Sequence, residues 1–318
     1  MYAASDVDPL ASISVDLDPI KHYCRIHGLP ESMLSDQVSE LVATKAIPRF
    51  LELFKAAGCP ATFFVVGEEL GSSTLSQVLL AAHEQGVELA NHSYAHDYGL
   101  SRSSFEAICD DLERADHAIF ACCGVRPVGF RAPGYTLSGA LMRAVVARGY
   151  AYDSSTYPAA PYYLAKAAVL GALSLLGRPS RAMLDSPKVL LAPVVPYRPS
   201  LEEPYERGDA PLVELPLAVA PVSRVPFIGT FATTMPWPVV EATFKSLRRV
   251  SHFNFELHAV DVLDESDGLP PVLARQQRDL KVPVRVKLER LARLFAWLGD
   301  ERQRVTIAEA AVRFAPLV

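Results

Sequence analysis

The chain has 318 residues, half of them hydrophobic, and a formal net charge of −5. This length supports a sizeable core, in one large α/β domain or in two smaller ones. No run of Lys and Arg offers a nucleic acid electrostatic attraction, and no apolar run reaches the roughly 18 residues that a membrane span needs. Composition therefore excludes a nucleic-acid binder and an integral membrane protein.

Apolar segments of two kinds alternate along the chain. Short runs rich in β-branched and aromatic residues, typical of buried strands, occur at 12–17, 61–66, 87–90, 128–131, 151–153, 212–215, 253–258 and 304–307. Longer segments with helical periodicity occur at 38–57, 75–85, 101–122, 138–148, 238–250 and 285–298. Repeated strand-then-helix units predict a parallel sheet with helical crossovers. The Pro-rich stretch 157–211, with one apolar helical piece at 163–176, breaks this pattern and is interpreted as an insertion.

The cysteines and the first residues bear on the compartment. Five cysteines are an odd number, and their positions lack zinc-ribbon spacing, which indicates free thiols in a reducing environment. The first residues show neither the basic nor the apolar region of a secretory signal. We therefore expect a cytoplasmic location, and a position at the inner face of the membrane is compatible with it.

Polar residues stand at the ends of five predicted strands, where strand-helix barrels gather their catalytic groups. They are Asp16 with Asp18, His92 with His96, Arg131, Asp153 and His258.

Each of these residues also has a plainer interpretation. His92 and His96 share a face if their segment forms one helical turn, and neutral imidazoles bind zinc and its neighbours, but isolated histidines also occur as surface groups. Strand alternation turns Asp16 and Asp18 toward one site, whereas an Asp-x-Asp alone is often a solvated turn. A single His such as His258 is more often a core residue with its hydrogen bonds satisfied.

The order of these motifs resembles the polysaccharide deacetylase family, also called the NodB-homology or carbohydrate esterase 4 family. The resemblance extends over about residues 11–312 and includes 59–67 and 305–309, which look like the family's second and last strands. The first motif, with Leu17 between the aspartates, is more similar to the formamido-arabinose deformylase branch. The resemblance implies a distorted (β/α) barrel of about seven strands. It also implies a single deacetylase domain spanning 1–318, with 157–211 as an insertion or lid.

The same resemblance implies a role for each motif residue. Asp18, His92 and His96 would hold one divalent metal ion, with Zn²⁺ first and Co²⁺, Ni²⁺ or Fe²⁺ as alternatives. Asp16 would be the general base, and Arg131 would orient it. His258 would be the general acid, and Asp153 would adjust its basicity. Gly134, Tyr135 and Leu257 would border the substrate.

The expected activity is removal of an acetyl or formyl group from the nitrogen of an amino sugar, in a polysaccharide or a lipid-linked glycan. Two alternatives remain, namely an allantoinase-like amidohydrolase of a small non-sugar C–N bond and a sugar-binding barrel without turnover. The apolar segment 163–181 raises the hypothesis of peripheral membrane contact. Its alternative is a helix packed on the barrel or in a dimer interface.

Overall fold

The computed structural model describes residues 8–175 and 183–318. Their strands form one sheet in which every pairing between named strands is parallel. The sheet runs in the order β6-β5-β4-β3-β2-β1-β7, and β8 pairs with β1 beside this path. The strands are β1 (Leu10–Asp16), β2 (Thr62–Val65), β3 (Glu88–Asn91), β4 (Gly129–Phe130), β5 (Tyr152–Asp153), β6 (Val213–Glu214), β7 (His252–His258) and β8 (Gln303–Arg304). The predicted distorted (β/α) barrel of about seven strands is confirmed, in the form of a half-barrel.

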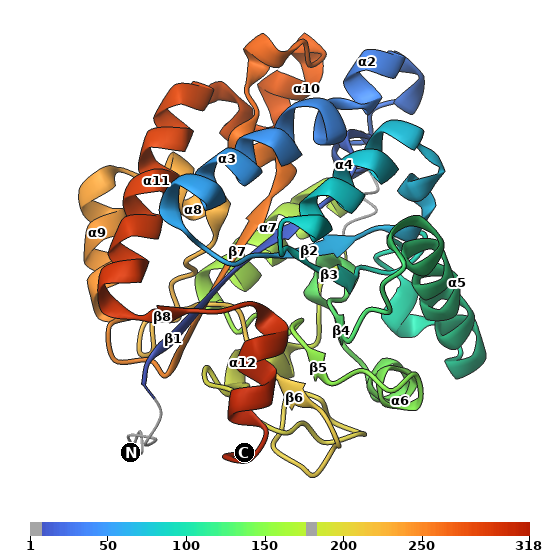
Figure 1. Cartoon of the computed structure of the whole chain (residues 1–318), viewed down its shortest axis with the longest axis vertical. Coiled ribbons are helices and arrows are strands. Elements are labelled where there is room, and N and C mark those ends of the chain that lie inside the picture. Colours follow the sequence, from blue (N-terminus) through green and yellow to red (C-terminus); the bar gives the residue numbers. More distant parts are fainter. Residues whose placement is uncertain (1–7, 176–182) are drawn as a thin grey trace.

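Helices surround this sheet, and α11, α3, α4, α5 and α6 follow one another around its outside (Figure 1). The helices are α1 (Ile20–Ile26), α2 (Asp36–Ser39), α3 (Ile47–Ala57), α4 (Ser73–Glu84), α5 (Phe105–Cys123), α6 (Gly139–Ala147), α7 (Ala160–Leu175), α8 (Gly229–Thr234), α9 (Trp237–Ser246), α10 (Pro271–Gln276), α11 (Val284–Glu301) and α12 (Ile307–Phe314). Short 3₁₀ turns join several of them.

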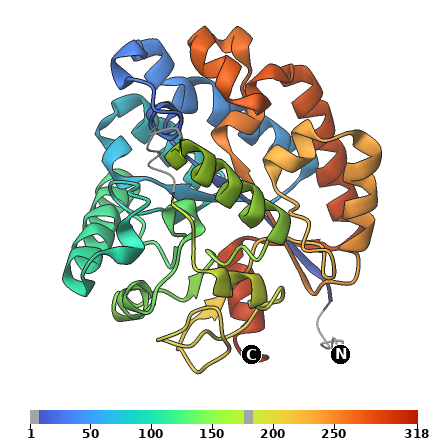
Figure 2. The same ribbon diagram turned by 180° about the vertical axis from the view of Figure 1, so that it is seen from behind.

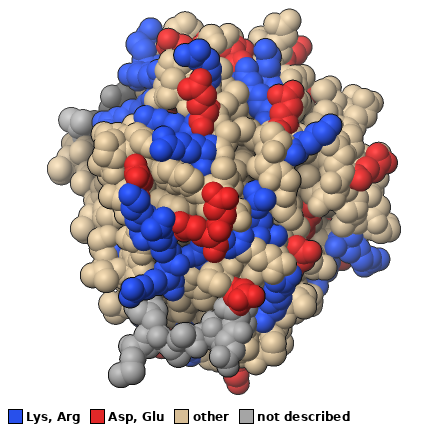
Figure 3. All heavy atoms as spheres, turned by 60° about the vertical axis from the view of Figure 1, so that its left-hand side comes forward, with Lys and Arg blue, Asp and Glu red and all other residues tan. Residues whose placement is uncertain are grey.

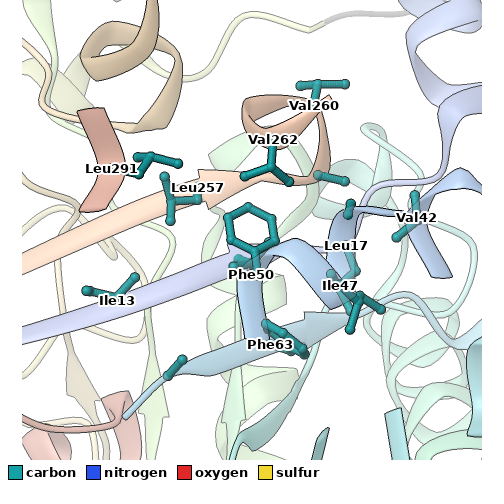
Figure 4. Close-up of a cluster of buried hydrophobic side chains, with 14 of the residues drawn as sticks. Ile13, Leu17, Val42, Ile47, Phe50, Phe63, Leu257, Val260, Val262 and Leu291 are labelled. Atoms are coloured by element: carbon teal, nitrogen blue, oxygen red, sulfur yellow. The ribbon is translucent and has the colours of Figure 1, made fainter. Parts of the chain in front are cut away.

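The two longest strands separate apolar from polar side chains by alternation. On β1, Ile13 and Val15 belong to the large apolar cluster that packs against the helices, and so do Phe255 and Leu257 on β7. Figure 4 shows this cluster, with Ile13 and Leu257 facing Phe50 from α3. The alternate residues therefore point to the inside of the half-barrel.

The inside of the half-barrel is polar and centres on Arg131. Its guanidinium donates to Ser14 Oγ at 2.9 Å, to Ser154 Oγ at 2.9 Å and to the Ser154 carbonyl at 2.8 Å. Asn254 on β7 donates to the same Ser154 Oγ at 2.9 Å. Because a buried guanidinium is costly without partners, this network fixes Arg131 in one position under the site.

Two predicted elements have different limits in the structure. The helix expected over 38–57 is divided into α2, a π-helical stretch over 42–46 and then α3, because Pro48 lacks the N–H that a continuous α-helix requires. The strand expected over 304–307 ends at Arg304. Thr306 then caps α12 through a reciprocal pair of hydrogen bonds with Glu309, so Ile307 is already helical.

The region 157–211 contributes α7, a 3₁₀ turn over 187–191 and an irregular chain. Viewed from behind, α7 crosses in front of the sheet (Figure 2). Residues 176–182, the end of the 163–181 segment, lie outside the described residues. Among the helices described, none combines the length and the apolar character needed to cross a membrane.

The face that carries α9 and α11 is mixed in charge. Figure 3 shows Lys and Arg side chains interleaved there with Asp and Glu. Ion pairs such as Lys245–Glu241 at 2.7 Å and Arg248–Glu301 at 2.7 Å belong to these helices and their flanking turns. Exposed pairs of this kind contribute little stability, about 0–1 kcal/mol each, and keep the face hydrated.

Candidate metal and catalytic site

The candidate site lies where the carboxyl ends of the parallel strands meet. Strand β1 ends at Asp16, which is in register with His258 at the end of β7. Asp18 follows two residues after β1, His92 directly follows β3, and Arg131 directly follows β4. Parallel strands thus bring together residues that are far apart in the sequence.

Asp18, His92 and His96 converge on one point. The Nε2 atoms of the two imidazoles are 3.2 Å apart, and they lie 3.4 Å and 2.9 Å from Asp18 Oδ1. All three side chains are buried, and Asp18 Oδ1 accepts no hydrogen bond of regular geometry among the described residues. A carboxylate oxygen that lacks such a bond and faces two imidazole nitrogens at this range fits a divalent cation between the three side chains.

The hydrogen bond on the far side of His92 sets its tautomer. Its Nδ1 lies 2.8 Å from the Arg131 carbonyl oxygen, which can only accept, so Nδ1 carries a proton and, in the neutral ring, Nε2 presents its lone pair. Burial opposes the charge on Asp18, but the imidazoles of His96 and His92 outweigh it and hold the pKa of Asp18 well below its usual range. The Asp18 carboxylate is therefore ionised at neutral pH.

A loop brings the histidines together, without the helical turn that would place them on one face. Ser93 and His96 have φ of +65° and +49°, and the Ser93 hydroxyl accepts from the His96 N–H at 2.9 Å. Asp111 on α5 accepts from the N–H groups of Tyr94 and Ala95. Left-handed backbone at residues other than Gly is costly, so these side-chain contacts hold the loop in its shape.

Asp16 and Arg131 form a buried ion pair beside this cluster. Arg131 Nη1 donates to Asp16 Oδ1 at 2.6 Å, while Asp16 Oδ2 lies 3.8 Å from His92 Nε2. Arg131 also lies 3.9 Å over the ring of Phe64, and both charged side chains are buried. One carboxylate oxygen is anchored by Arg131, and the other faces the imidazoles.

His258 is paired with a carboxylate that sequence reasoning missed. Its Nδ1 lies 2.8 Å from Glu256 Oε1, and its Nε2 lies 3.1 Å from the Tyr135 hydroxyl. Burial alone would lower the pKa of His258, but the Glu256 carboxylate, followed by Asp18 and Asp16, raises it well above the ordinary value. The i, i+2 alternation that we applied to the two aspartates would have found Glu256 as well.

Asp153 does not lie where its expected role requires it. Its Oδ1 accepts from Ser155 Oγ at 2.7 Å, and Ser155 supports the loop after β4 by accepting from the Ala132 N–H. Its register partner is Glu214 on β6. Burial and the nearby Asp153 raise the pKa of Glu214 well above its usual range. The carboxylate beside the His258 ring is Glu256.

The residues expected to border the substrate divide into two groups. Gly134 and Tyr135 line a cavity of about 570 Å³ that also contains Asp16, Asp18, both metal-site histidines and His258. Leu257 does not line it. Because Glu256 and His258 point into the site, the residue between them points outward, and Leu257 is fully buried in the apolar cluster. Its assignment to the acyl pocket was wrong.

His22 is a second neighbour that the motifs did not indicate. Its ring stacks on His96 with the centroids 4.2 Å apart, and neither ring nitrogen has a partner among the described residues. Burial lowers the pKa of His22 to about 2, so it is a neutral aromatic support for the His96 ring. A lone histidine on α1 carries no sequence signal for this position.

The sheet carries one Asp and two His at its carboxyl edge, which is the arrangement that the resemblance implied. Residues 36–152 match the family model for polysaccharide deacetylase. Over these residues the chain is similar to polysaccharide deacetylases. The matched residues include both metal-site histidines and Arg131, whereas Asp16, Asp18 and His258 lie outside them.

Named relatives and a solved structure agree with this similarity. A peptidoglycan deacetylase of Helicobacter pylori is 27% identical over 159 residues, which cover 49% of this chain and 53% of that protein. A peptidoglycan deacetylase-like protein of Gibberella zeae is 26% identical over 157 residues, which cover 48% of this chain and 46% of that protein. The chain thus spans about half the length of these curated relatives. A polysaccharide deacetylase-type crystal structure from Mycobacterium smegmatis aligns over 98% of this chain and 92% of its own, at 16% identity and a TM-score of 0.62, and supports the fold.

Proposed function

We propose that this protein is a metal-dependent hydrolase that removes an acetyl or formyl group from the nitrogen of an amino sugar, in a polysaccharide or a lipid-linked glycan. One observation carries the proposal. The convergent Asp18, His92 and His96 adjoin a carboxylate held by Arg131 and an imidazole held by Glu256, all within one cavity. A binding barrel without turnover has no need of a base and an acid placed on two sides of a metal site.

Asp18, His92 and His96 would hold the ion, and Zn²⁺ suits two imidazoles and one carboxylate, as do Co²⁺, Ni²⁺ and Fe²⁺. When bound, such an ion acts as a Lewis acid toward the amide carbonyl and the attacking water. Asp16 Oδ2, whose partner oxygen is fixed by Arg131, accepts the proton of that water. Arg131 holds the Asp16 carboxylate in place.

His258 supplies the proton to the departing nitrogen. An amine leaves poorly without a proton, so the acid must be charged when the C–N bond breaks. Glu256 raises the pKa of His258, which keeps the imidazolium populated at neutral pH, and the Tyr135 hydroxyl lies 3.1 Å from the nitrogen that faces the cavity. Asp16 and His258 thus take opposite roles because one adjoins a cation and the other a carboxylate.

We further propose that the domain is single and that 157–211 forms a lid within it. Ala165 and Lys166 of α7 line the same cavity as the catalytic residues, which supports this role.

Leu164 and Leu175 on α7 are exposed, which supports peripheral contact of this helix with a membrane that carries a lipid-linked substrate. The five free cysteines support a cytoplasmic location at the inner face of such a membrane.

Metal analysis combined with product release tests the function. The purified protein should hold about one divalent ion per chain and should release acetate or formate from N-acylated amino-sugar oligomers. A protein that binds no divalent metal would sink the proposal. Metal with hydrolysis of a small cyclic ureide alone would indicate the allantoinase-like alternative, and metal without any turnover would indicate a binding barrel.

Vesicle flotation tests the membrane contact. Wild type should float with vesicles containing anionic lipid, and the double variant Leu164→Ser, Leu175→Ser should not. Equal flotation of the two proteins, or flotation of neither, would leave the helix as a lid alone.

A further inference from the structure

Helix α7 has an inverted distribution of polar and apolar side chains. It contains one charged residue, Lys166, and that residue is half-buried and lines the cavity of the catalytic site. Leu164 and Leu175 on the same helix are 64% and 91% exposed and are not among the residues that line this cavity. A helix on a protein surface ordinarily turns its charges to water and its apolar residues inward. The inward position of Lys166 therefore needs a reason within the cavity.

A row of aromatic rings connects this lysine to the catalytic imidazole. The Tyr135 hydroxyl is 3.1 Å from His258 Nε2, and the centroids of Tyr135 and Tyr157 are 5.2 Å apart. Tyr157 and Tyr162 follow at 5.0 Å, and Lys166 Nζ is 5.7 Å from the Tyr162 ring centroid. All of these residues line the cavity. A sugar ring can pack its C–H face on such tyrosines, with its amide at one end of the row and its next substituent toward Lys166.

Lys166 has no ion-pair partner in the described parts of the chain. Its nearest electrostatic partner, Asp185, already accepts hydrogen bonds from the Tyr205 hydroxyl and the Ser186 N–H. Lys166 is also the single Lys or Arg among the described residues that line this cavity. Removing a cation from water without a partner costs free energy, and a ligand that carries the opposite charge offsets this cost.

We propose that Lys166 recognises an anionic group, a carboxylate or a phosphate, on the amino sugar whose amide is cleaved or on its neighbouring unit. This inference rests on the proposed function and narrows its substrate class to acidic amino-sugar compounds. The ammonium would make a charge-assisted hydrogen bond to the anion across the tyrosine row, while the metal site and His258 act on the amide at the other end. Lys166 is then a specificity-determining residue, and its contribution appears in binding of the substrate.

Kinetics on three probes, each in N-acetyl and N-formyl form, test the inference. The probes are a neutral glucosamine disaccharide, a disaccharide with muramic acid as the carboxylate arm, and glucosamine 1-phosphate as the phosphate arm. Wild type should have its lowest KM on one charged probe. Lys166→Met should raise that KM about 10–100-fold and leave the neutral probe within about twofold. Lys166→Arg should restore most of the binding, and the arm with the larger effect identifies the anion.

Two controls keep the outcomes separate. Lys245→Met removes an exposed lysine on α9 and should match wild type on all probes. Lys166→Met should unfold at a temperature no lower than wild type, because it removes a half-buried charge without a partner. Equal KM changes on neutral and charged probes, or a wild-type preference for the neutral probe, would overturn the inference alone. No acyl release from any probe would overturn the proposed function and this inference together.

Discussion

Asp16 and Asp18 are two residues apart on the same chain segment, and yet their surroundings differ. Asp16 has one oxygen fixed by Arg131 at 2.6 Å, in a network that continues through Ser14 and Ser154. Asp18 has imidazoles as its neighbours, at 2.9 Å and 3.4 Å from Oδ1. A carboxylate with one oxygen fixed by a guanidinium presents its other oxygen to the site in a defined position, as a proton acceptor requires. A carboxylate among imidazole lone pairs is suited to bind a cation that arrives from solution.

The largest expected effect comes from breaking the cation site. His92→Ala removes one of three ligands, and activity should fall to about one ten-thousandth or less, together with loss of the ion. Elemental analysis of the purified protein measures the ion. His117→Ala, at an exposed position on α5, is the matched control and should keep both metal and rate. Full metal occupancy in the His92 variant would contradict the assignment of His92 as a metal ligand.

The complementary change is Asp16→Asn, which keeps the shape and removes the proton acceptor. Metal occupancy should stay near that of wild type while kcat falls about a thousandfold, the usual contribution of a positioned general base. Elemental analysis and initial rates on one preparation measure both quantities. If Asp16→Asn loses the ion and Asp18→Asn retains it, the two roles are exchanged.

Glu256→Gln tests the pairing of the acid and should lower kcat at neutral pH about 10–100-fold. Glu256 raises the pKa of His258, so its removal lowers that pKa, and a smaller fraction of the imidazole is protonated at any given pH above it. The high-pH limb of the kcat profile should therefore move to lower pH. A thermal unfolding curve separates this effect from loss of fold, and an unmoved limb in a folded variant would argue against His258 as the acid.

Asp153→Asn distinguishes the two carboxylates that could adjust His258. Asp153 contacts Ser155 and adjoins Glu214, so its replacement should leave the high-pH limb in place and change kcat by less than about threefold. The same pH series measured beside Glu256→Gln provides the comparison. A shift as large as that of the Glu256 variant would restore the role expected from the sequence.

The smallest effect on catalysis is expected from Leu257→Ala, which alters the outward face of β7. Its side chain is fully buried among apolar neighbours, so the free energy of unfolding should fall by about 2–5 kcal/mol. KM and kcat at a temperature where the variant is folded should stay within about twofold of wild type. Urea unfolding measures the free energy of unfolding, and steady-state kinetics measure KM and kcat. A change in preference between acetyl and formyl substrates would place Leu257 in the acyl pocket after all.

Strand ends were the most predictable part of this molecule. Asp16, His92, Arg131 and His258 all close apolar runs, and a parallel sheet brings the ends of such runs to one edge. The sheet and the gathering of these residues therefore followed from local patterns.

The errors arose where local patterns depend on their surroundings. The alternation of side chains along β7 would have selected Glu256 and excluded Leu257. The error at these two residues arose because this rule was not applied to β7. The limits of α3 depended on the π-helical stretch before Pro48. Which side of α7 faces the site depended on the row of tyrosines that it covers, and no periodicity in an almost uniformly apolar segment encodes this choice.

The register that pairs Asp16 with His258 joins a strand near the start of the chain to one near its end. A nascent chain cannot assemble the proton acceptor and the proton donor until nearly all of it has been synthesised, and closing so distant a pair is among the slower steps of folding. Cleaved or unfinished fragments that lack β7 would therefore retain the cation ligands but have no means to complete the reaction.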